Sequence, residues 1–415
     1  MQLIRDMDAR LAALVEPLRL PLLAAAVAVT LGYMLYKLWV GPGADFVDAE
    51  VFWVAGRLWN DGANPYDVEV LRVGMVSLLE RESPSVWGYM PHFHAIAGPM
   101  ALMDVDTATA AFTALNLALL TAAALLIGAA ADETGRGRIL LVPAAVALAY
   151  LMMSTPAIEM VFLGQSRGLM LFAIALFAYG ALRDRPVAVA AALVIVTTKP
   201  DIGLVFVAYC LADRRFWPAL LAGGVASLIL AAWPLLQTGP LAIAASIVDS
   251  LGTYAGTEAN SAWYMNGVRH LAWQATGGGD IGKTGPVLLA SALAFAASRL
   301  AATRAADRDA ALRAGVALAT LLALNFASIH FNSLILLTVL LIAWRTGTGA
   351  LLALAALALT FRFVVVVRLA GIDAITLGDR VFVSLLLVAV LAATAALFAV
   401  ALRAPAAAGP RGRRP

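Results

Sequence analysis

Three carboxylates follow the first apolar segment of the chain, in the stretch GADFVDAEVFW. Asp45, Asp48 and Glu50 lie there beside aromatic residues. A carboxylate at the boundary between membrane and water is partly desolvated, which raises its pKa and suits it to accept a proton from a hydroxyl group. Solvated loop acids are the alternative interpretation. The pattern therefore predicts a candidate general base in this stretch.

Other polar side chains lie at or near the ends of later apolar segments, where they are costly unless they face a cavity. These candidates are Gln165, Arg167, Lys199, Asp201, Asn260, Ser261, Arg269, His270 and His330. Each has a structural alternative: Gln165 could cap a helix, Lys199 could extend toward the lipid headgroups, and His330 could bond to a backbone carbonyl.

Several cations are candidate partners for a lipid phosphate, because a cation near the headgroup plane can neutralise it. Lys199 and Arg167 form one pair, and Arg362 and Arg368 lie near the outer end of a later expected helix. Arg362 would lie about 9 Å deeper along that helix than Arg368, so an ion pair with a neighbouring helix is its alternative role.

The composition limits the kind of protein that can position these groups. Of the 415 residues, 62% are hydrophobic and 13% are charged, and the mean hydropathy is +0.88, which excludes an ordinary soluble enzyme. The net charge of +3 is too small to indicate nucleic-acid binding. The single cysteine, Cys210, excludes a disulfide within the chain.

Common motifs for nucleotide binding, hydrolysis and metal binding are absent from the sequence. There is no G-x-x-x-x-G-K-[ST] loop, which argues against an ATP-driven transporter, and no G-x-S-x-G elbow. His92 and His94 lack further ligands at metal spacing, so we expect no metal site there. Asp45 and Asp48 could still bind a divalent cation through their oxygens.

Apolar segments with about the length of membrane helices recur along the chain, about twelve in all. They lie at 21–40, 107–131, 139–153, 166–182, 186–198, 200–212, 216–236, 285–302, 311–326, 330–344, 348–369 and 380–402. There is no internal repeat and no separate soluble domain. The sequence predicts a single all-α polytopic membrane domain over residues 1–415.

The charges divide the expected loops into two sets. With the N-terminus inside, 18 of the 29 Lys and Arg residues fall on the inner side, as the positive-inside rule requires. Both termini, with the basic tail 404–415, are then cytoplasmic. Two long loops, 41–106 and 237–284, lie on the outer side, where we expect the chemistry. The first contains amphipathic stretches, of which HFHAIAGPMALM is expected as an interfacial helix.

The motifs, in their order along the chain, resemble glycosyltransferase family 87, the polyprenyl-phosphate-mannose-dependent mannosyltransferases. DAEVFWVAGRLWNDGANPYD is similar to the family's first-loop signature, and GYMPHFHAIAGPMALM is similar to its Tyr-x-Pro helix. FLGQSRG is similar to its Gly-Gln turn, TTKPD to its Lys-Pro segment and ASIHFN to its late histidine. These motifs span about 45–332, most of the chain.

The resemblance implies a GT-C fold with about 12 transmembrane helices and with juxtamembrane helices in the first extracytoplasmic loop. It also implies a catalytic aspartate in that loop. Asp48 matches this aspartate by lying four residues before Phe52, whereas Asp45 matches it by the Phe46 that follows. His330 matches a functional histidine of the family.

The resemblance further implies residues that face the donor. Lys199 and Gln165 match such positions, whereas Arg167 stands where the family more often has a neutral residue. The candidate substrate-binding residues are Gln165, Asn260, Tyr89 and His94, and the candidate donor phosphate-binding residues are Lys199, Arg167 and Arg368.

From these residues and this resemblance we expect an inverting glycosyltransferase of a bacterial-type plasma membrane, with its active site facing the periplasm or exterior. The expected donor is a polyprenyl-phosphate-linked sugar, mannose by the resemblance, and the acceptor a glycolipid or cell-envelope glycan. No cofactor and no nucleic acid are expected. The alternatives are a secondary transporter or lipid flippase, or a structural partner of a polysaccharide-export complex. The absence of a repeat and the gathering of the candidates at one membrane face favour the transferase.

Overall fold

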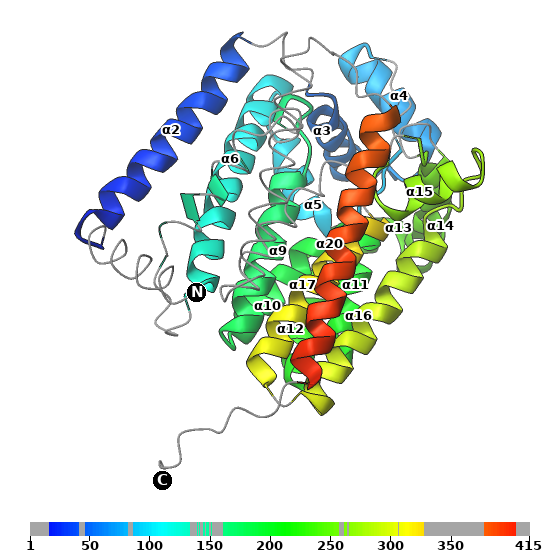
Figure 1. Cartoon of the computed structure of the whole chain (residues 1–415). Coiled ribbons are helices and arrows are strands. Elements are labelled where there is room, and N and C mark those ends of the chain that lie inside the picture. Colours follow the sequence, from blue (N-terminus) through cyan, green and yellow to red (C-terminus); the bar gives the residue numbers. More distant parts are fainter. Residues whose placement is uncertain are drawn as a thin grey trace.

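The computed structural model is all-helical over the part of the chain that it describes (Figure 1). The described residues are 16–40, 46–81, 86–132, 139, 141, 144–145, 147–148, 151, 161–256, 261–263, 265–305, 307–327 and 377–403. The predicted all-α class is therefore confirmed over these ranges.

The helices fall into two groups by length. The long helices are α2 (Arg19–Val40), α6 (Val105–Ala130), α16 (Thr284–Arg304), α17 (Arg308–Ala327) and α20 (Leu377–Arg403). The shorter ones are α3 (Val47–Asn60), α4 (Val68–Leu79), α5 (His94–Met100), α9 (Arg167–Leu182), α10 (Pro186–Val196), α11 (Pro200–Ala212), α12 (Trp217–Leu230), α13 (Ala232–Thr238), α14 (Pro240–Gly256) and α15 (Val268–Ala275). Within the described ranges, the 3₁₀ turns η1 (Glu16–Leu18), η2 (Pro91–Phe93) and η3 (Arg214–Phe216) precede α2, α5 and α12.

Three described helices, α6, α16 and α17, are long and apolar enough to cross a membrane. The segment Arg214–Leu230 and the helix that follows it, α13, add a fourth candidate span, bent by 54° at its break. The described residues thus supply three or four of the roughly twelve expected spans. The predicted segments 330–344 and 348–369 lie outside the described residues, as does most of 139–153.

Proline sets where two of the short helices begin. Pro186 and Pro200 occupy the first positions of α10 and α11, where a proline lacks only an N–H that has no helical partner. The break between these helices, at Thr197 to Lys199, leaves Lys199 as the residue that caps α11. The two short apolar segments predicted at 186–198 and 200–212 are therefore two separate helices, α10 and α11, and Lys199 lies at the break between them.

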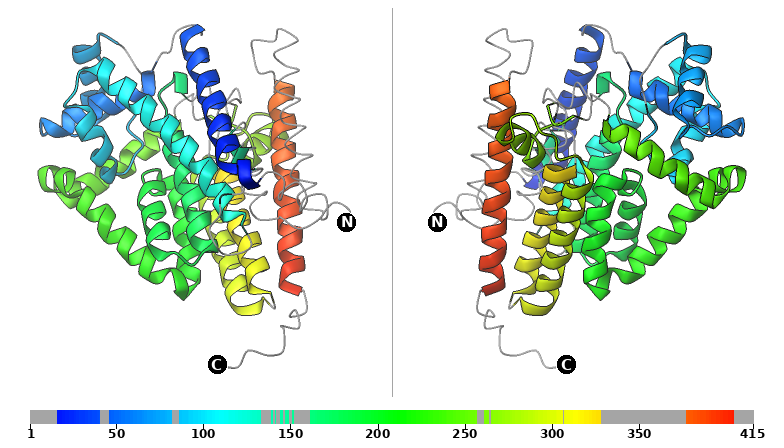
Figure 2. Two further views of the ribbon diagram at one scale, coloured as in Figure 1. Left: turned by 90° about the vertical axis from the view of Figure 1, so that its left-hand side faces the viewer. Right: turned by 90° about the vertical axis from the view of Figure 1, so that its right-hand side faces the viewer.

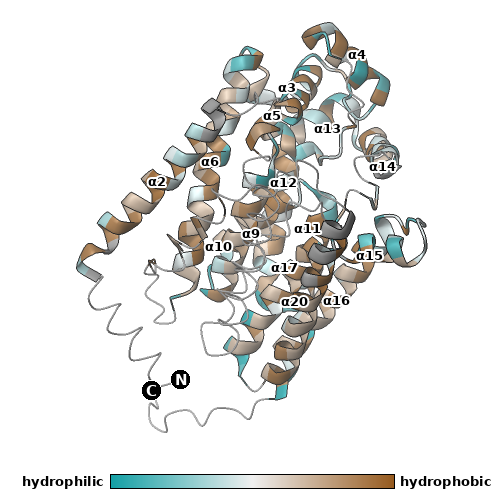
Figure 3. Cartoon of the chain, turned by 45° about the horizontal axis from the view of Figure 1, so that its top comes forward, coloured by the Kyte–Doolittle hydropathy of each residue, from teal (hydrophilic) through white to brown (hydrophobic). Residues whose placement is uncertain are grey.

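The two expected long loops are themselves largely helical. The 41–106 segment contains α3, α4 and α5, and the 237–284 segment contains α14 and α15. Helices α3 and α4 lie at one end of the helix bundle, and the C-terminal end of α20 lies at the other (Figure 1; Figure 2). Figure 3 shows hydrophobic residues along α2 and hydrophilic residues on α4 and α15.

An aromatic cluster forms the interior of the 41–106 segment. The ring of Phe52 on α3 meets the rings of Trp87, Tyr89 and Phe93 edge-on, with centroids 5.1 to 6.1 Å apart. Such edge-to-face contacts add to the stabilisation from burial alone. The cluster fixes α3 relative to the non-helical segment before η2, which includes Tyr89.

Two hydrogen bonds to backbone carbonyl groups tie this stretch to the helix bundle. The Met90 N–H donates to the Thr198 carbonyl at 2.9 Å, directly before Lys199. The Ser250 hydroxyl on α14 donates to the Trp87 carbonyl at 2.6 Å. Segments far apart in the sequence, near residues 48, 89, 199 and 250, are thereby brought together at one end of the bundle.

Candidate functional site

Asp48 lies in the first turn of α3 and is fixed there by the turn of the FLGQSRG motif. Its backbone N–H donates to the Leu163 carbonyl at 3.0 Å. Gly164 follows with a φ of +65°, and a Cβ at this glycine would lie 2.6 Å from the Cβ of Ala49. Only glycine meets both requirements. The turn therefore packs directly against the start of α3 and carries Gln165 to the carboxylate of Asp48.

The surroundings of Asp48 change the proton affinity of its carboxyl group. Burial raises the pKa of Asp48 above its usual range, and this effect outweighs the opposing effects of Lys199, Arg167 and a hydrogen bond from Gln165. The positive charges of Lys199 and Arg167 and the hydrogen bond from Gln165 still favour the ionised form of the carboxyl group. A desolvated carboxylate that is held by fixed cations is suited to take a proton from a hydroxyl group.

Three cations stand at the N-termini of three helices in this region, and two of them, Arg167 and Lys199, act on the Asp48 carboxylate. Arg167 is the first residue of α9, Lys199 caps α11 and Lys283 caps α16. A helix N-terminus carries partial positive charge, so a cation there is at the unfavourable end of the helix dipole. Helices α9 and α11 pack against each other, since the ring centroids of Phe177 on α9 and Phe206 on α11 are 4.9 Å apart. The three positive ends together form a region that attracts an anion.

Tyr89 contacts both Lys199, at the start of α11, and Ser166, directly before α9. The Lys199 ammonium lies 5.1 Å from the centroid of the Tyr89 ring, within the range of a cation–π interaction. The Tyr89 hydroxyl is 2.7 Å from the Ser166 hydroxyl. Burial raises the pKa of Tyr89 above its usual range, with the Asp48 charge adding to the effect. The phenol therefore remains neutral and keeps its hydrogen for a bond.

A cavity of about 220 Å³ opens beside Tyr89 and Lys199. Its polar lining residues include Tyr89, Lys199, Asp201, Tyr254 and Lys283. Its apolar lining residues include Leu204, Leu251 and Leu288, of which Leu204 and Leu288 are also exposed on the outside of α11 and α16. A cavity lined both by two lysines and by these three leucines, which we call the leucine wall, fits an amphiphile with an anionic head.

The structure brings four of the sequence-predicted residues to Asp48. Gln165, Arg167 and Lys199 act on its carboxylate, and Tyr89 lies against Lys199. The predicted residues Asp45, Asn260, His330 and Arg368 lie outside the described residues, as does Arg362.

His94 is not brought to this cluster. Its Nε2 is 3.1 Å from the Oδ1 of Asn60, and its ring meets the Trp59 ring edge-on. Asn60 is the last residue of α3, so it lies about 18 Å along the helix from Asp48. His94 fastens α5 to the far end of α3, where burial lowers the pKa of its imidazole and keeps it neutral.

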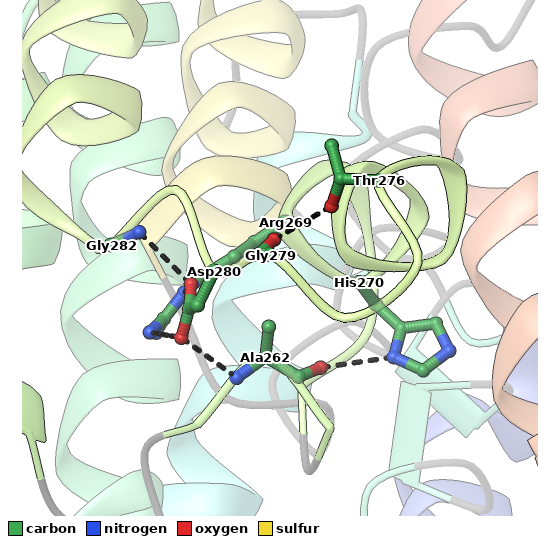
Figure 4. Close-up of polar contacts among 7 residues, drawn as sticks. All are labelled: Ala262, Arg269, His270, Thr276, Gly279, Asp280 and Gly282. Carbon is green, nitrogen blue, oxygen red and sulfur yellow. Dashed lines mark hydrogen bonds and ion pairs between the residues drawn. The ribbon is translucent and has the colours of Figure 1, made fainter.

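Arg269 and His270, two further candidates from the second loop, fix the shape of that loop (Figure 4). The Arg269 guanidinium donates to both carboxylate oxygens of Asp280, through Nε at 2.8 Å and a terminal nitrogen at 2.5 Å. Asp280 also accepts from the backbone N–H groups of Ala262 and Gly282. The His270 imidazole bonds to the Ala262 carbonyl through Nδ1 at 2.9 Å. We name this arrangement of Arg269, Asp280, Ala262 and Gly282 the loop clasp.

Sequence reasoning missed Lys283 and Tyr254. Lys283 ends the second long loop and begins the apolar helix α16. A lysine at a helix N-terminus is electrostatically disfavoured, which was the available signal for another role. Tyr254 carried no such signal, because its place beside Lys283 depends on how α14 packs against α16.

Among the described residues, no group of three or more His, Cys, Asp or Glu side chains could hold a metal ion. The anion-attracting chemistry of the described site comes instead from Lys and Arg.

Comparison with known protein families gives a match over a large part of the chain. The sequence model of Glycosyltransferase family 87 matches residues 87–330, more than half of the chain. No curated protein sequence and no solved structure matches the chain significantly. The matched range contains Gln165, Arg167, Lys199 and Lys283, and it begins after Asp48.

Proposed function

The chain belongs to glycosyltransferase family 87, and we propose that it moves a sugar from a polyprenyl-phosphate donor to a hydroxyl group of a lipid-linked or cell-envelope glycan. The observation that carries this proposal is the position of Asp48 among Lys199, Arg167 and Gln165, beside a cavity with an apolar wall. By the resemblance of its motifs, the sugar is mannose.

The proposed reaction is a single displacement at the anomeric carbon. Asp48 takes the proton of the acceptor hydroxyl, whose oxygen forms a bond to the anomeric carbon. The bond from that carbon to the phosphate oxygen breaks, and its electron pair leaves with the phosphate. Attack from the face opposite the phosphate inverts the anomeric configuration. The products are the glycosylated acceptor, a protonated Asp48 and a polyprenyl phosphate with one more negative charge.

The cations contribute most where this negative charge develops. The phosphate gains charge as the bond to the sugar breaks, so fixed cations stabilise the transition state more than the bound donor. Lys199 and Arg167 are at helix N-termini, and their positions are set before the donor arrives. Preorganised charges of this kind cost no rearrangement during the reaction.

The distribution of charge along the sequence supports a location in a bacterial-type plasma membrane with the site on the outer side. A polyprenyl donor would reach the cavity from the lipid phase, past the exposed side chains of Leu204 and Leu288. The proposed step uses side chains of the protein and needs no cofactor.

A donor comparison tests the proposal. Membranes containing the protein would receive either polyprenyl-phosphate-linked mannose or nucleotide-linked mannose, each radiolabelled, together with a membrane glycolipid extract as acceptor. We expect labelled glycolipid from the polyprenyl donor, with inverted anomeric configuration. Transfer from the nucleotide donor, or retained configuration, would contradict the proposal. Movement of labelled lipid across vesicles without transfer would favour the transporter alternative.

A further inference from the structure

Lys283 lines the cavity together with Lys199 but takes no part in the cluster around Asp48. Its side chain is only 11% exposed, and its Nζ lies 3.6 Å from an Asp201 carboxylate oxygen. The same ammonium lies 4.9 Å from the centroid of the Tyr254 ring. Lys283 and Lys199 therefore line one cavity from two neighbouring helices, α16 and α11.

The loop clasp holds the backbone that precedes Lys283. The Arg269 side chain that anchors it is only 4% exposed, and its bonds to Asp280 are bidentate, the stronger form of such a pair. Burial opposes ionisation of Asp280, but the hydrogen bonds from Arg269 dominate and lower the pKa of this carboxyl. Asp280 thus remains charged, and its bond to the Gly282 N–H fixes the residue next to Lys283.

The net charge of the residues that line the cavity would be balanced by one monovalent anion. Among the residues that line the cavity, Lys199 and Lys283 supply two positive charges, and Asp201 supplies one negative charge. One negative charge would balance the set, and a phosphodiester carries one. The other Asp201 oxygen accepts from the Ile202 N–H at the start of α11, so Asp201 is shared between Lys283 and its own helix.

The position of Lys283 is costly without an anion. Burial lowers the pKa of its ammonium, the charges of Lys199 and Arg269 lower it further, and Asp201 acts in the opposite direction. Lys283 is also at the unfavourable end of the α16 dipole. An anion in the cavity would relieve these unfavourable interactions, because it would add opposite charge at both helix ends.

We propose that Lys283 binds the phosphate of the lipid-linked donor together with Lys199, and that the Arg269–Asp280 pair positions Lys283 for this contact. Leu204, Leu251 and Leu288 would contact the first isoprenoid units of the same molecule. The inference rests on the proposed function, in which that donor is the substrate. The ligand class is a lipid phosphate with a single isoprenoid chain on the phosphate.

Binding of polyprenyl phosphate without a sugar tests this inference separately from sugar transfer. The purified full-length protein in nanodiscs of zwitterionic lipid would be titrated with polyprenyl phosphate, with inorganic phosphate and with phosphatidylglycerol. We expect saturable binding of polyprenyl phosphate and much weaker binding of the other two. Lys283→Gln should weaken it about tenfold, as expected for a lost charge-assisted hydrogen bond, and Lys283→Arg should retain most of it. Equal binding of inorganic phosphate would overturn the part assigned to the leucine wall.

Arg72→Gln is the matched control. Arg72 is an exposed cation on α4, paired with Glu69, so its loss leaves an unpaired acid as the loss of Lys283 does. We expect unchanged binding in this variant. If Lys283→Gln binds polyprenyl phosphate as tightly as Arg72→Gln and the wild type do, the assignment of Lys283 is wrong.

Transfer kinetics test the positioning role of the loop clasp. Asp280→Asn should raise the donor KM several-fold and lower kcat by a smaller factor, because it loosens Lys283 at the phosphate without changing Asp48. An unchanged KM in Asp280→Asn would overturn the positioning role. Lys283-dependent binding without any transfer would contradict only the proposed function, whereas transfer with normal binding by Lys283→Gln would contradict only this inference.

Discussion

The backbone N–H of Asp48 donates to the carbonyl oxygen of Leu163 at 3.0 Å, although 115 positions separate the two residues in the sequence. This bond joins the start of α3 to the Gly-Gln turn before α9. The carboxylate that we propose as the base is therefore positioned by the same turn that supplies Gln165 and Arg167.

Gly164→Ala should disturb this junction. Alanine at a φ of +65° is strained by about 1–2 kcal/mol, and its Cβ would collide with Ala49. We expect kcat for sugar transfer to fall by about tenfold to a hundredfold, because a small displacement of a catalytic group is costly. Gly62→Ala is the control: its φ is +81°, and a Cβ there would meet nothing within 4 Å. Equal losses in the two variants would mean that backbone strain alone, and not the contact with Ala49, is responsible.

The pH profile of transfer should report the ionisation of Asp48. A base must be deprotonated, so kcat/KM should fall as the pH decreases through the pKa of Asp48, which burial raises above the usual value of about 3.9. Lys199→Gln removes a cation that lowers this pKa, so the acidic limb should move to higher pH. Arg167→Gln should move it in the same direction. The profiles are compared after normalising each variant to its own maximum. An acidic limb that stays in place, or moves to lower pH, would contradict the assignment.

Substitutions of Tyr89 separate the role of its ring from that of its hydroxyl. Tyr89→Phe removes the contact with Ser166 and keeps the ring beside Lys199. We expect the donor KM to change little. Tyr89→Leu removes the ring, and the lost cation–π interaction of about 0.5–2 kcal/mol should raise the donor KM by about twofold to thirtyfold. Donor KM measured for both variants gives the comparison, and a larger effect from Tyr89→Phe would show that the hydroxyl matters more than the ring.

The sequence predicted the local features of this fold well. Long apolar runs correctly indicated α6, α16 and α17, because a helix must satisfy its own backbone groups wherever water is absent. The Lys-Pro pair correctly marked a helix boundary, because proline at the first position of α11 has no N–H to lose. The first long loop, 41–106, was expected to contain short helices, and α3 and α5 confirm this.

Contacts between distant segments were harder to predict. Lys283 and Asp201 are 82 positions apart and meet only because α16 packs against α11. A pattern along one helix does not specify its neighbour, so this pair was not foreseen. His94 was expected near the substrate, and this stays a prediction; its Nε2 contacts Asn60, at the far end of α3 from Asp48. A histidine that binds substrate and a histidine that holds two helices together can both lie among aromatic residues in the sequence, so the local pattern does not distinguish these two roles.

The measurement that tests the central claim most directly compares chemistry with donor binding in Asp48→Asn. Asparagine keeps the size of the side chain and cannot accept the proton. We expect kcat for sugar transfer to fall by about a hundredfold or more, while the affinity for polyprenyl phosphate stays within a few-fold of the wild type. Asp61→Asn, which removes an exposed carboxylate just beyond α3, should leave both quantities unchanged. A kcat for Asp48→Asn equal to that of Asp61→Asn would contradict the account, because Asp48 could then not be the base.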